Sequence, residues 1–290
     1  MSQKSSPEKI PGESEVEAEA QYLEQHERRE AARRTAPRAA IVYEAVRREG
    51  EQELARPIAA LAWSGLAAGL SMGFSFLSQS LLASWLPQAH WSIVVSGLGY
   101  SVGFLMVILG RQQLFTENTL TPILVFLRKP DAVTAGRTLR LWVVVLIANT
   151  LGAFLFALLI AKTNLLVPQV HAAMNEVSSQ VFAAFPLTLL RGIFAGWLIA
   201  MIIWLLPFAE TARVGIIILI TYVIALGHFA HIIAGSVDAF YAALSGNVPW
   251  GAFFTEFYVP TVLGNIIGGV SLVAAINYAQ VETLEQRNSD

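Results

Sequence analysis

The chain has 290 residues, of which 55% are hydrophobic and 14% charged, and its formal net charge is −2 with a mean hydropathy of +0.55. This apolar share argues against a soluble domain and predicts a protein that crosses a membrane several times. The absence of cysteine excludes disulfides and thiolate metal sites. The near-balanced charge gives no reason to expect nucleic acid as a partner.

The first part of the chain is a polar leader, rich in Glu, Arg, Gln and Ala, without a span-length apolar run or the apolar core of a signal peptide. We predict an irregular start followed by a charged helix. Between Glu27 and Arg48 arginines lie beside apolar residues, so this helix is either solvated or bound to anionic headgroups. We therefore expect three segments, namely a cytoplasmic leader at 1–55, a six-helix transmembrane domain at 56–280 and a cytoplasmic tail at 281–290.

The stretch from Pro57 to Gly110 contains no Arg, Lys, Asp or Glu. A spanning helix needs about 20 mainly apolar residues, so this stretch holds two spans, which turn at residues 86–90. Four further spans are predicted, at roughly 141–161, 188–206, 214–244 and 257–279. The fold class is therefore an all-α membrane protein with six transmembrane helices.

Basic residues are concentrated in particular connections. Most precede the first span or lie between spans two and three, and Arg213 precedes span five. Because basic residues favour cytoplasmic loops, this bias predicts that both termini are cytoplasmic.

Two otherwise uncharged helical stretches are interrupted by polar, glycine-bearing segments, at Gly110–Thr119 and Gly227–Ser236. Backbone leaves a helix at membrane depth only where protein or a water-filled cavity satisfies the freed N–H and C=O groups. We therefore expect a solute pathway at these breaks, in the second and fifth helices.

Sequence elements repeat between the two halves of the chain. Asn149–Ala153 in span three and Asn265–Gly269 in span six share the pattern N-x-x-G-small. Glycines at four-residue spacing recur in spans one and four, at Gly65, Gly69, Gly73, Gly192 and Gly196. Such residues let helices approach closely. Because each half has an odd number of spans, equivalent halves form an inverted repeat with its site near the midplane, unless the matches are chance.

The first break, Leu114–Asn118, places two apolar side chains beside a hydroxyl, a carboxylate and an amide. An apolar constriction stops hydrated ions, and the hydroxyl of Thr116 behind it is suited to bond a dehydrated solute. The alternative is an ordinary loop capped by Thr116 or Asn118. Arg111 either pairs with Glu117 or attracts anions to the mouth of the loop.

The second break contains His231 among apolar residues, with no acid closer in the sequence than Asp238. Burial favours the neutral imidazole, a hydrogen-bond donor and a candidate proton carrier. The alternative is a satisfied core histidine. His228 lies three residues earlier, but the chain has no H-E-x-x-H, and no Ser or Thr has a visible base partner in the sequence. We therefore expect no metal, no cofactor and no enzymatic activity.

These elements together carry a resemblance to a known family. The L-F-T-x-N loop at 114–118, the F-x-H at 229–231 and the N-x-x-G elements of spans three and six occur in order over about residues 57–280. In this arrangement the chain resembles a divergent branch of the formate/nitrite transporter family.

The resemblance implies an aquaporin-like protomer with its own pore, a homopentamer in a bacterial inner membrane, and Thr116 facing the central His231. It implies a cytoplasmic constriction of Leu114, Phe115 and Ile199 and a periplasmic one of Tyr100, Phe104 and Ile224. Members of the family pass formate, nitrite, hydrosulfide or lactate, as the anion or as the neutral acid formed near the histidine.

The chain departs from the family pattern beside the pore, at Gln113, Ala230, Gly196, Arg111 and Glu117. The predicted function is a channel or transporter for a small monocarboxylate or inorganic anion, or its conjugate acid, with proton relay at His231 in the lipid bilayer. The alternatives are a channel for a neutral solute, such as water, ammonia or hydrogen sulfide, and a nonconducting membrane scaffold that recruits partners through its leader.

Overall fold

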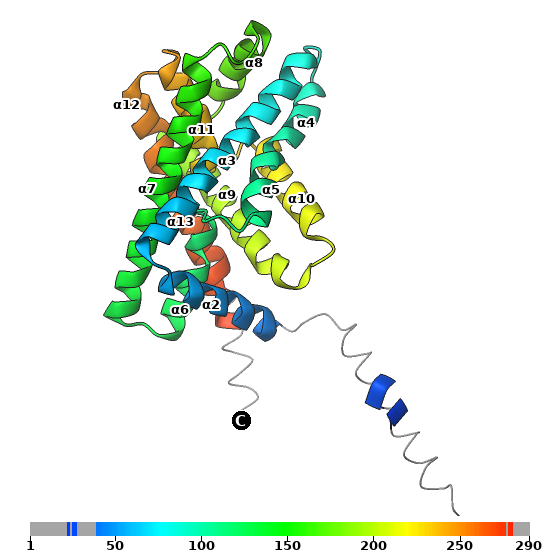
Figure 1. Ribbon diagram of the computed structural model, residues 1–290, viewed down its shortest axis with the longest axis vertical. Helices are drawn as coiled ribbons and strands as arrows, with labels where there is room; N and C mark the ends of the chain where they lie inside the picture. The colour runs from blue at the N-terminus through cyan, green and yellow to red at the C-terminus, as the bar shows by residue number, and fades with distance from the viewer. Residues whose placement is uncertain (1–21, 24, 28–38, 277, 281–290) are drawn as a thin grey trace, which may run out of the picture. The chain divides into compact units, whose positions relative to one another are not determined.

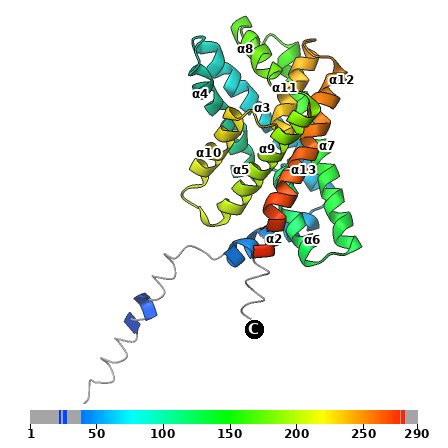
Figure 2. The same cartoon turned by 180° about the vertical axis from the view of Figure 1, so that it is seen from behind.

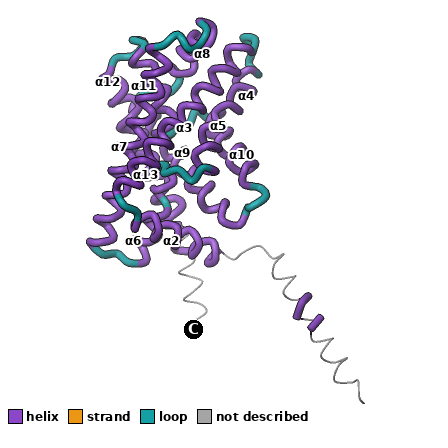
Figure 3. Tube along the Cα trace, in the orientation of Figure 1, coloured by secondary structure: helices purple, strands orange, loops and turns teal. Residues whose placement is uncertain are grey.

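The computed structural model describes residues 22, 23, 25–27, 39–276 and 278–280, and Figure 1 draws the remainder as a thin grey trace. The predictions for most of the leader before residue 39, and for the tail at 281–290, lie outside the described residues. In the described ranges all regular secondary structure is helical (Figure 3), which confirms the all-α fold class.

The first half of the membrane domain follows a short helix, α2 (Ala39–Ala55), and contains three membrane-crossing segments. Its elements are α3 (Ile58–Trp85), α4 (Ser92–Ser96), η1 (Gly97–Tyr100), α5 (Ser101–Leu109), η2 (Glu117–Thr119), α6 (Thr121–Arg128) and α7 (Ala132–Lys162). The helix α7 begins before the predicted span because Asp131 caps it, accepting a hydrogen bond from the Thr134 amide at 2.7 Å.

The second half repeats this order after a connecting helix, α8 (Pro168–Ser179). Its elements are α9 (Phe185–Leu205), η3 (Leu206–Phe208), α10 (Arg213–Leu226), α11 (Ile232–Leu244), α12 (Trp250–Ala252), η4 (Phe253–Tyr258), α13 (Val259–Ile267) and η5 (Gly268–Ala275). In both halves the middle segment is broken, as α5–α6 and as α10–α11.

Among the described residues, four uninterrupted helical stretches are long and apolar enough to cross a membrane, at Ile58–Trp85, Ser92–Leu109, Ala132–Lys162 and Phe185–Phe208. The helices α10 and α11 are apolar but shorter, because the break divides the fifth span between them. The last segment runs from α12 to η5 with π-helical turns inside it. This arrangement is consistent with six spans.

Glycines bring the outer helices of each half into close contact. Gly69 of α3 lies against Asn149 and Gly152 of α7, and Gly196 of α9 lies against Asn265 of α13. A Cβ atom at Gly69 or Gly196 would overlap the backbone of the facing asparagine. Figure 2 shows α9 and α13 side by side, and these close approaches place each asparagine beside the broken segment of its own half.

The helix α2 packs against α6 at one end of the bundle, opposite α8 (Figure 1). Its contacts are apolar, through a cluster of Tyr43, Val46, Leu120, Leu124, Ala200 and Ile203. The Tyr43 hydroxyl also donates a hydrogen bond to the Leu124 carbonyl at 3.4 Å, and its ring lies 6.2 Å from that of Tyr278. Residues near both ends of the described unit therefore share one end of the bundle, which we name the α2 end, the opposite one being the α8 end.

Candidate functional site

The two breaks have the same backbone geometry. α5 and α10 are each followed by a glycine C-cap, Gly110 and Gly227, and in each case the residue after the glycine adopts a left-handed conformation. These residues, Arg111 and His228, both have φ of 49° and are the only non-glycine residues in the described ranges with positive φ. A bulky side chain in this region is strained, so the sharp exit from each helix is held by surrounding contacts.

A buried asparagine supplies those contacts in the first half. The Nδ2 of Asn149 donates to the carbonyls of Gly65, at 2.7 Å, and Gln113, at 2.8 Å. Its Oδ1 accepts from the Phe115 amide at 2.9 Å. One side chain thus satisfies backbone groups that the helix break leaves free and ties the loop to α3.

The second half repeats this arrangement bond for bond. The Nδ2 of Asn265 donates to the carbonyls of Gly192 and Ala230, both at 2.8 Å, and its Oδ1 accepts from the Ile232 amide at 2.9 Å. We call each set of three bonds an asparagine clasp. The two clasps extend the internal repeat, which the sequence indicated by short motifs, to individual hydrogen bonds.

The two breaks meet through Thr116 and His231. Thr116 Oγ1 lies 2.8 Å from His231 Nε2, and both side chains are buried. His231 is the N-cap of α11, and its Nδ1 accepts hydrogen bonds from the amides of Ile233, at 3.2 Å, and Ala234, at 3.1 Å. Because amides only donate, Nδ1 carries no proton, so the neutral ring carries its proton on Nε2 and donates it to Thr116.

With its proton on Nε2 and its Nδ1 occupied, the His231 ring acts only as a hydrogen-bond donor toward Thr116 in this conformation. His231 is only 1% exposed, and the Phe104 ring meets it edge-on with centroids 4.9 Å apart. The ring presents an N–H donor toward Thr116. A second proton on Nδ1 would displace both amides at the start of α11, so charging the ring requires a local rearrangement.

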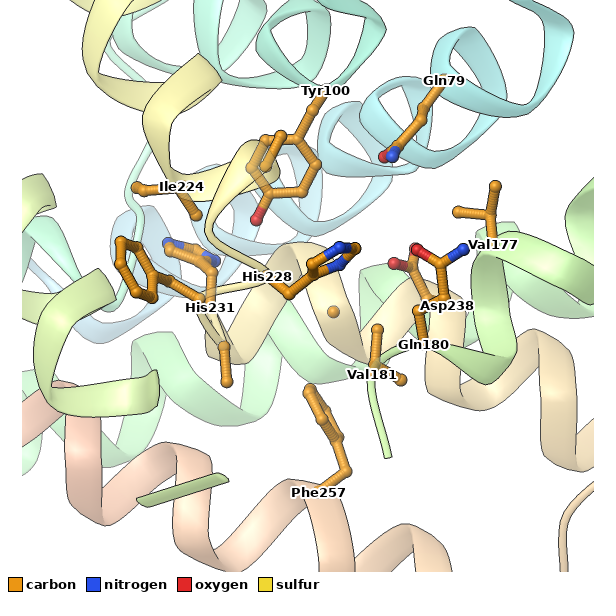
Figure 4. A pocket seen from close by; sticks show the side chains of 14 residues that line it. Gln79, Tyr100, Val177, Gln180, Val181, Ile224, His228, His231, Asp238 and Phe257 are labelled. Carbon is orange, nitrogen blue, oxygen red and sulfur yellow. The ribbon is translucent and has the colours of Figure 1, made fainter. Parts of the chain in front are cut away.

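A cavity of approximately 50 Å³ adjoins His231, and its lining includes Val177 of α8, the helix at the α8 end (Figure 4). Two of the predicted periplasmic residues, Tyr100 and Ile224, line it together with His231. The third, Phe104, contacts Tyr100 with ring centroids 5.2 Å apart. Polar side chains that the sequence did not single out as pathway residues also line the cavity, namely Gln79, Gln180, His228 and Asp238.

A larger cavity, approximately 400 Å³, lies toward the α2 end. Its charged lining consists of Arg48, Glu49, Glu53, Arg56, Arg111, Glu117 and Arg213. No ion pair joins Arg111 to Glu117 in the described structure, and Glu117 Oε1 is buried without a hydrogen-bond partner in the protein. On α2, burial raises the pKa of the Glu53 carboxyl, and Arg56 at 3.1 Å opposes that shift.

The two cavities have no lining residue in common. Leu114, Phe115 and Ile199, the predicted cytoplasmic constriction, are all buried in one apolar cluster. Phe115 also packs edge-on against Trp142 of α7, with ring centroids 6.2 Å apart. Thr116 directly follows Leu114 and Phe115, so its hydroxyl lies next to this apolar cluster.

Asn118, also predicted as a pathway residue, makes its contacts within the loop. Its Nδ2 donates to Gln113 Oε1 at 3.1 Å, and its carbonyl accepts from Trp142 Nε1 at 2.7 Å. These bonds hold the loop against α7.

Sequence reasoning missed some of the functional side chains. The sequence indicated Asn149 and Asn265 only as parts of a repeat motif. A buried amide side chain beside a helix break is, however, a signal that it bonds the backbone N–H and C=O groups left free there. Asp238 was noted only as the nearest acid, although an ionisable residue within an apolar helix is itself a signal of function. In the described part of the chain no three His, Cys, Asp or Glu side chains gather in a metal-binding group.

Two inverted half-bundles, each with a broken middle helix and a polar contact where the breaks meet, define a membrane protein of the channel or transporter class. The family model for formate/nitrite transporters matches residues 40–279. The chain is 38% identical over 269 residues to the inner membrane protein YfdC of Escherichia coli, covering 92% of this chain and 87% of that protein. The protein belongs to the formate/nitrite transporter family.

Two more distant relatives agree with this assignment. The formate channel BtFdhC of Bacillus thuringiensis is 24% identical over 246 residues, which cover 82% of this chain and 93% of that protein. A solved structure described as a pentameric formate channel with formate bound has the same fold, with a TM-score of 0.64 at 18% identity, covering 81% of this chain and 98% of the other.

The structure shows what three of the residues that depart from the family pattern contact. Gln113 and Ala230 occupy equivalent positions, since the carbonyl of each accepts a bond from the clasp asparagine of its half. The Gln113 side chain is engaged by Asn118. Gly196 stands where α9 approaches the Asn265 backbone too closely for any side chain.

Proposed function

We propose that this protein passes a small monovalent anion, or its conjugate acid, across the membrane along the path between the two cavities. The observation that carries the proposal is the buried Thr116–His231 hydrogen bond between the two broken helices, in a chain of the formate/nitrite transporter family. The formate bound to a protein of the same fold makes formate the first solute to test.

Dehydration is the main energetic obstacle for such a solute. Moving an ionised carboxylate into an apolar medium costs several kcal/mol or more, whereas the neutral acid loses far less. The cavity at the α2 end contains four arginines and three glutamates, and we propose that it captures the anion. The apolar Leu114, Phe115 and Ile199 then exclude water, so the neutral form crosses more readily.

The Nε2–H of His231 and the hydroxyl of Thr116 replace part of the lost hydration shell as the solute passes. The N-terminus of α11 adds a positive potential at the same place, which favours an anion near the ring. Proton relay by His231 requires Nδ1 to gain a proton as Nε2 gives one up. We therefore propose that relay is coupled to release of the Ile233 and Ala234 amides.

The remaining pathway residues follow from this order. In this proposal Tyr100, Phe104 and Ile224 form the periplasmic constriction, with Arg111 and Glu117 setting the charge of the cytoplasmic mouth. The α2 end is then cytoplasmic. This orientation is favoured by Arg48, Arg56 and the basic residues of the α6–α7 connection. Both chain termini would lie in the cytoplasm.

The test is a stopped-flow survey of the purified protein in liposomes, against formate, nitrite, acetate, lactate, hydrosulfide and water, at two pH values. We expect rapid flux of one or more of the monovalent anions, faster at the more acidic pH. A protein impermeable to all six solutes would overturn the proposal and favour the nonconducting scaffold.

His231→Asn is the sharpest single substitution for the role of the ring. Asparagine is a strong N-cap and keeps an acceptor for the start of α11, but it removes the imidazole that reaches Thr116. We expect formate flux to fall at least roughly tenfold, equivalent to about 1.4 kcal/mol, with the thermal midpoint nearly unchanged. Flux and a pH profile equal to those of the wild type would reject the role.

His231→Phe is the matched comparison. It removes both the ring donor and the cap acceptor, so we expect the same loss of flux together with a loss of about 1–2 kcal/mol of stability. The difference between the two variants separates the transport role of His231 from its structural one.

A channel for a neutral solute is the second candidate function. It is favoured by the neutral, N–H-donating state that the helix cap imposes on His231. Flux that follows the neutral species as external pH is varied, with no electrical current, would select it.

A further inference from the structure

The cavity toward the α8 end contains an acid that the proposed mechanism does not use. Asp238 lies two turns after His231 on α11, is 6% exposed and lines the cavity with Tyr100 and His228. Figure 4 shows Asp238 among the side chains that line the cavity, with Gln180 also in the lining. The cavity lining contains no Arg or Lys, and no ion pair to Asp238 occurs in the described part of the chain.

A carboxylate buried without a counter-charge is costly, and the cost falls when the group takes up a proton or exchanges one with a solute. The neighbouring side chains suit a small polar solute. Gln79 and Gln180 offer both donors and acceptors, and Tyr100 offers a hydroxyl. The cavity therefore combines a proton-exchanging carboxyl with groups able to hold a small acid beside it.

His231 is poorly suited to supply the proton. Its Nδ1 is occupied by the Ile233 and Ala234 amides, so loss of the Nε2 proton would leave an anionic ring unless both cap bonds broke. The Asp238 side chain, in contrast, does not cap a helix. It is therefore the acid of this cavity that gains or loses a proton without breaking the hydrogen bonds at the start of α11.

Other titratable groups surround α11 and set the background for any pH dependence. Besides Tyr100 and His228 in the cavity, they are His171 and Glu176 of α8, Lys162 at the end of α7, Glu256 and Tyr258 of η4, and Tyr241 of α11 itself. Lys162 donates to the Leu244 carbonyl at 2.8 Å, and His171 bonds the Tyr241 hydroxyl at 2.9 Å. None of these groups is ion-paired with Asp238.

We propose that Asp238 is a second proton-exchange group of the pathway, which protonates a small monovalent anion in the cavity toward the α8 end and takes the proton back from the neutral acid in the reverse direction. The O–H bond of the Asp238 carboxyl breaks, a new O–H bond forms on the solute, and Asp238 remains as carboxylate until water from the α8 end returns a proton. The proposal rests on the proposed function.

The test compares Asp238→Asn, which cannot exchange a proton, with Asp238→Glu, which can. Glu176→Gln, an exposed acid on α8 that does not line the cavity, is the matched control for loss of one negative charge. Formate flux into liposomes is measured over a series of pH values on the α8 side. We expect D238N to flatten the pH dependence and to lower flux at least roughly tenfold, while D238E and E176Q keep the wild-type profile.

Infrared pH-difference spectra of the same proteins give a readout independent of flux. We expect a carbonyl stretching band of a protonated carboxyl that is missing in D238N, present in E176Q, and weakened when formate is added. A band that ignores formate, or a D238N pH profile equal to that of E176Q, would overturn the inference while leaving the proposed function intact. Absence of formate flux in every protein, wild type included, would instead count against the proposed function, and the infrared response to formate would then decide on Asp238.

Discussion

The contact between Thr116 and His231 joins the two breaks through a hydrogen bond. The direction of this bond follows from the other side of the ring, because the α11 amides occupy Nδ1 and thereby leave the proton on Nε2. The same histidine is thus a helix cap on one side and a donor to Thr116 on the other. Because this structural role and the proposed transport role fall on one ring, a substitution that removes both at once cannot separate them.

Thr116→Val tests the hydroxyl with almost no change of shape. Valine leaves the His231 Nε2–H buried without an acceptor, which costs about 1–3 kcal/mol and also removes one bonding partner of the solute. We expect formate flux in liposomes to fall roughly 10- to 100-fold.

The matched control for this change is Thr121→Val. Thr121 is also buried at the first break, but its hydroxyl has no hydrogen-bond partner in the protein. Its flux should stay near that of the wild type. Equal loss in the two variants would mean that any change of polarity at this break impairs transport, and the specific role of Thr116 would be wrong.

Helix packing explains why the breaks are tolerated. In each half an asparagine on the third segment reaches the broken segment only because glycines let it lie directly against the first segment. The clasp and the close packing therefore depend on each other, since a wider spacing would move the amide away from the carbonyls it satisfies.

Gly69→Ala tests this dependence. The added methyl would overlap the Asn149 carbonyl, so α3 and α7 must separate, and we expect a loss of about 1–3 kcal/mol of stability as overpacking and a weakened clasp combine. The measurement is the thermal unfolding midpoint of the purified protein in detergent.

Gly136→Ala is the control on the same packed pair of helices. Gly136 is exposed on α7, and a Cβ there meets no atom within 4 Å. Alanine favours the helix by about 0.5–1 kcal/mol, so this variant should be as stable as the wild type or slightly more stable. If both variants unfold at the wild-type temperature, the close approach at Gly69 is not what holds the clasp.

The outer surface of the membrane domain carries a stripe of exposed apolar side chains. On α7, large side chains at four-residue spacing are exposed along one face, at Val143, Ile147, Leu151, Leu155 and Leu159. We expect such a stripe to face lipid or another copy of the chain, because exposing these apolar side chains to water costs free energy. Both cavities and the Thr116–His231 contact lie within one chain, so the proposed pathway does not need assembly to form.

We expect five copies to assemble, as the pentameric formate channel of the same fold does. Native mass spectrometry of the protein released from a mild detergent should give the mass of five chains, and the same species should persist in nanodiscs. A stable monomer in both environments would show that the apolar stripes face lipid alone. Because each chain carries its own cavities, such a result would leave the proposed transport function untouched.

Periodicity and composition were enough to predict an all-helical membrane domain, the breaks in its second and fifth segments, and the inverted repeat. Burying charges or free backbone groups in a membrane costs free energy, and this cost restricts which residues occur in each segment. Family motifs pointed to Thr116 and His231. The pairing of His231 with Thr116 and the partners of Asn149 and Asn265 depended on contacts between residues far apart in the chain, such as Gly65 with Asn149. The cavity around Asp238 likewise depended on α3, α8 and α11 converging. No local pattern encodes which distant groups will lie within hydrogen-bonding distance, so these features became visible only in the folded protein.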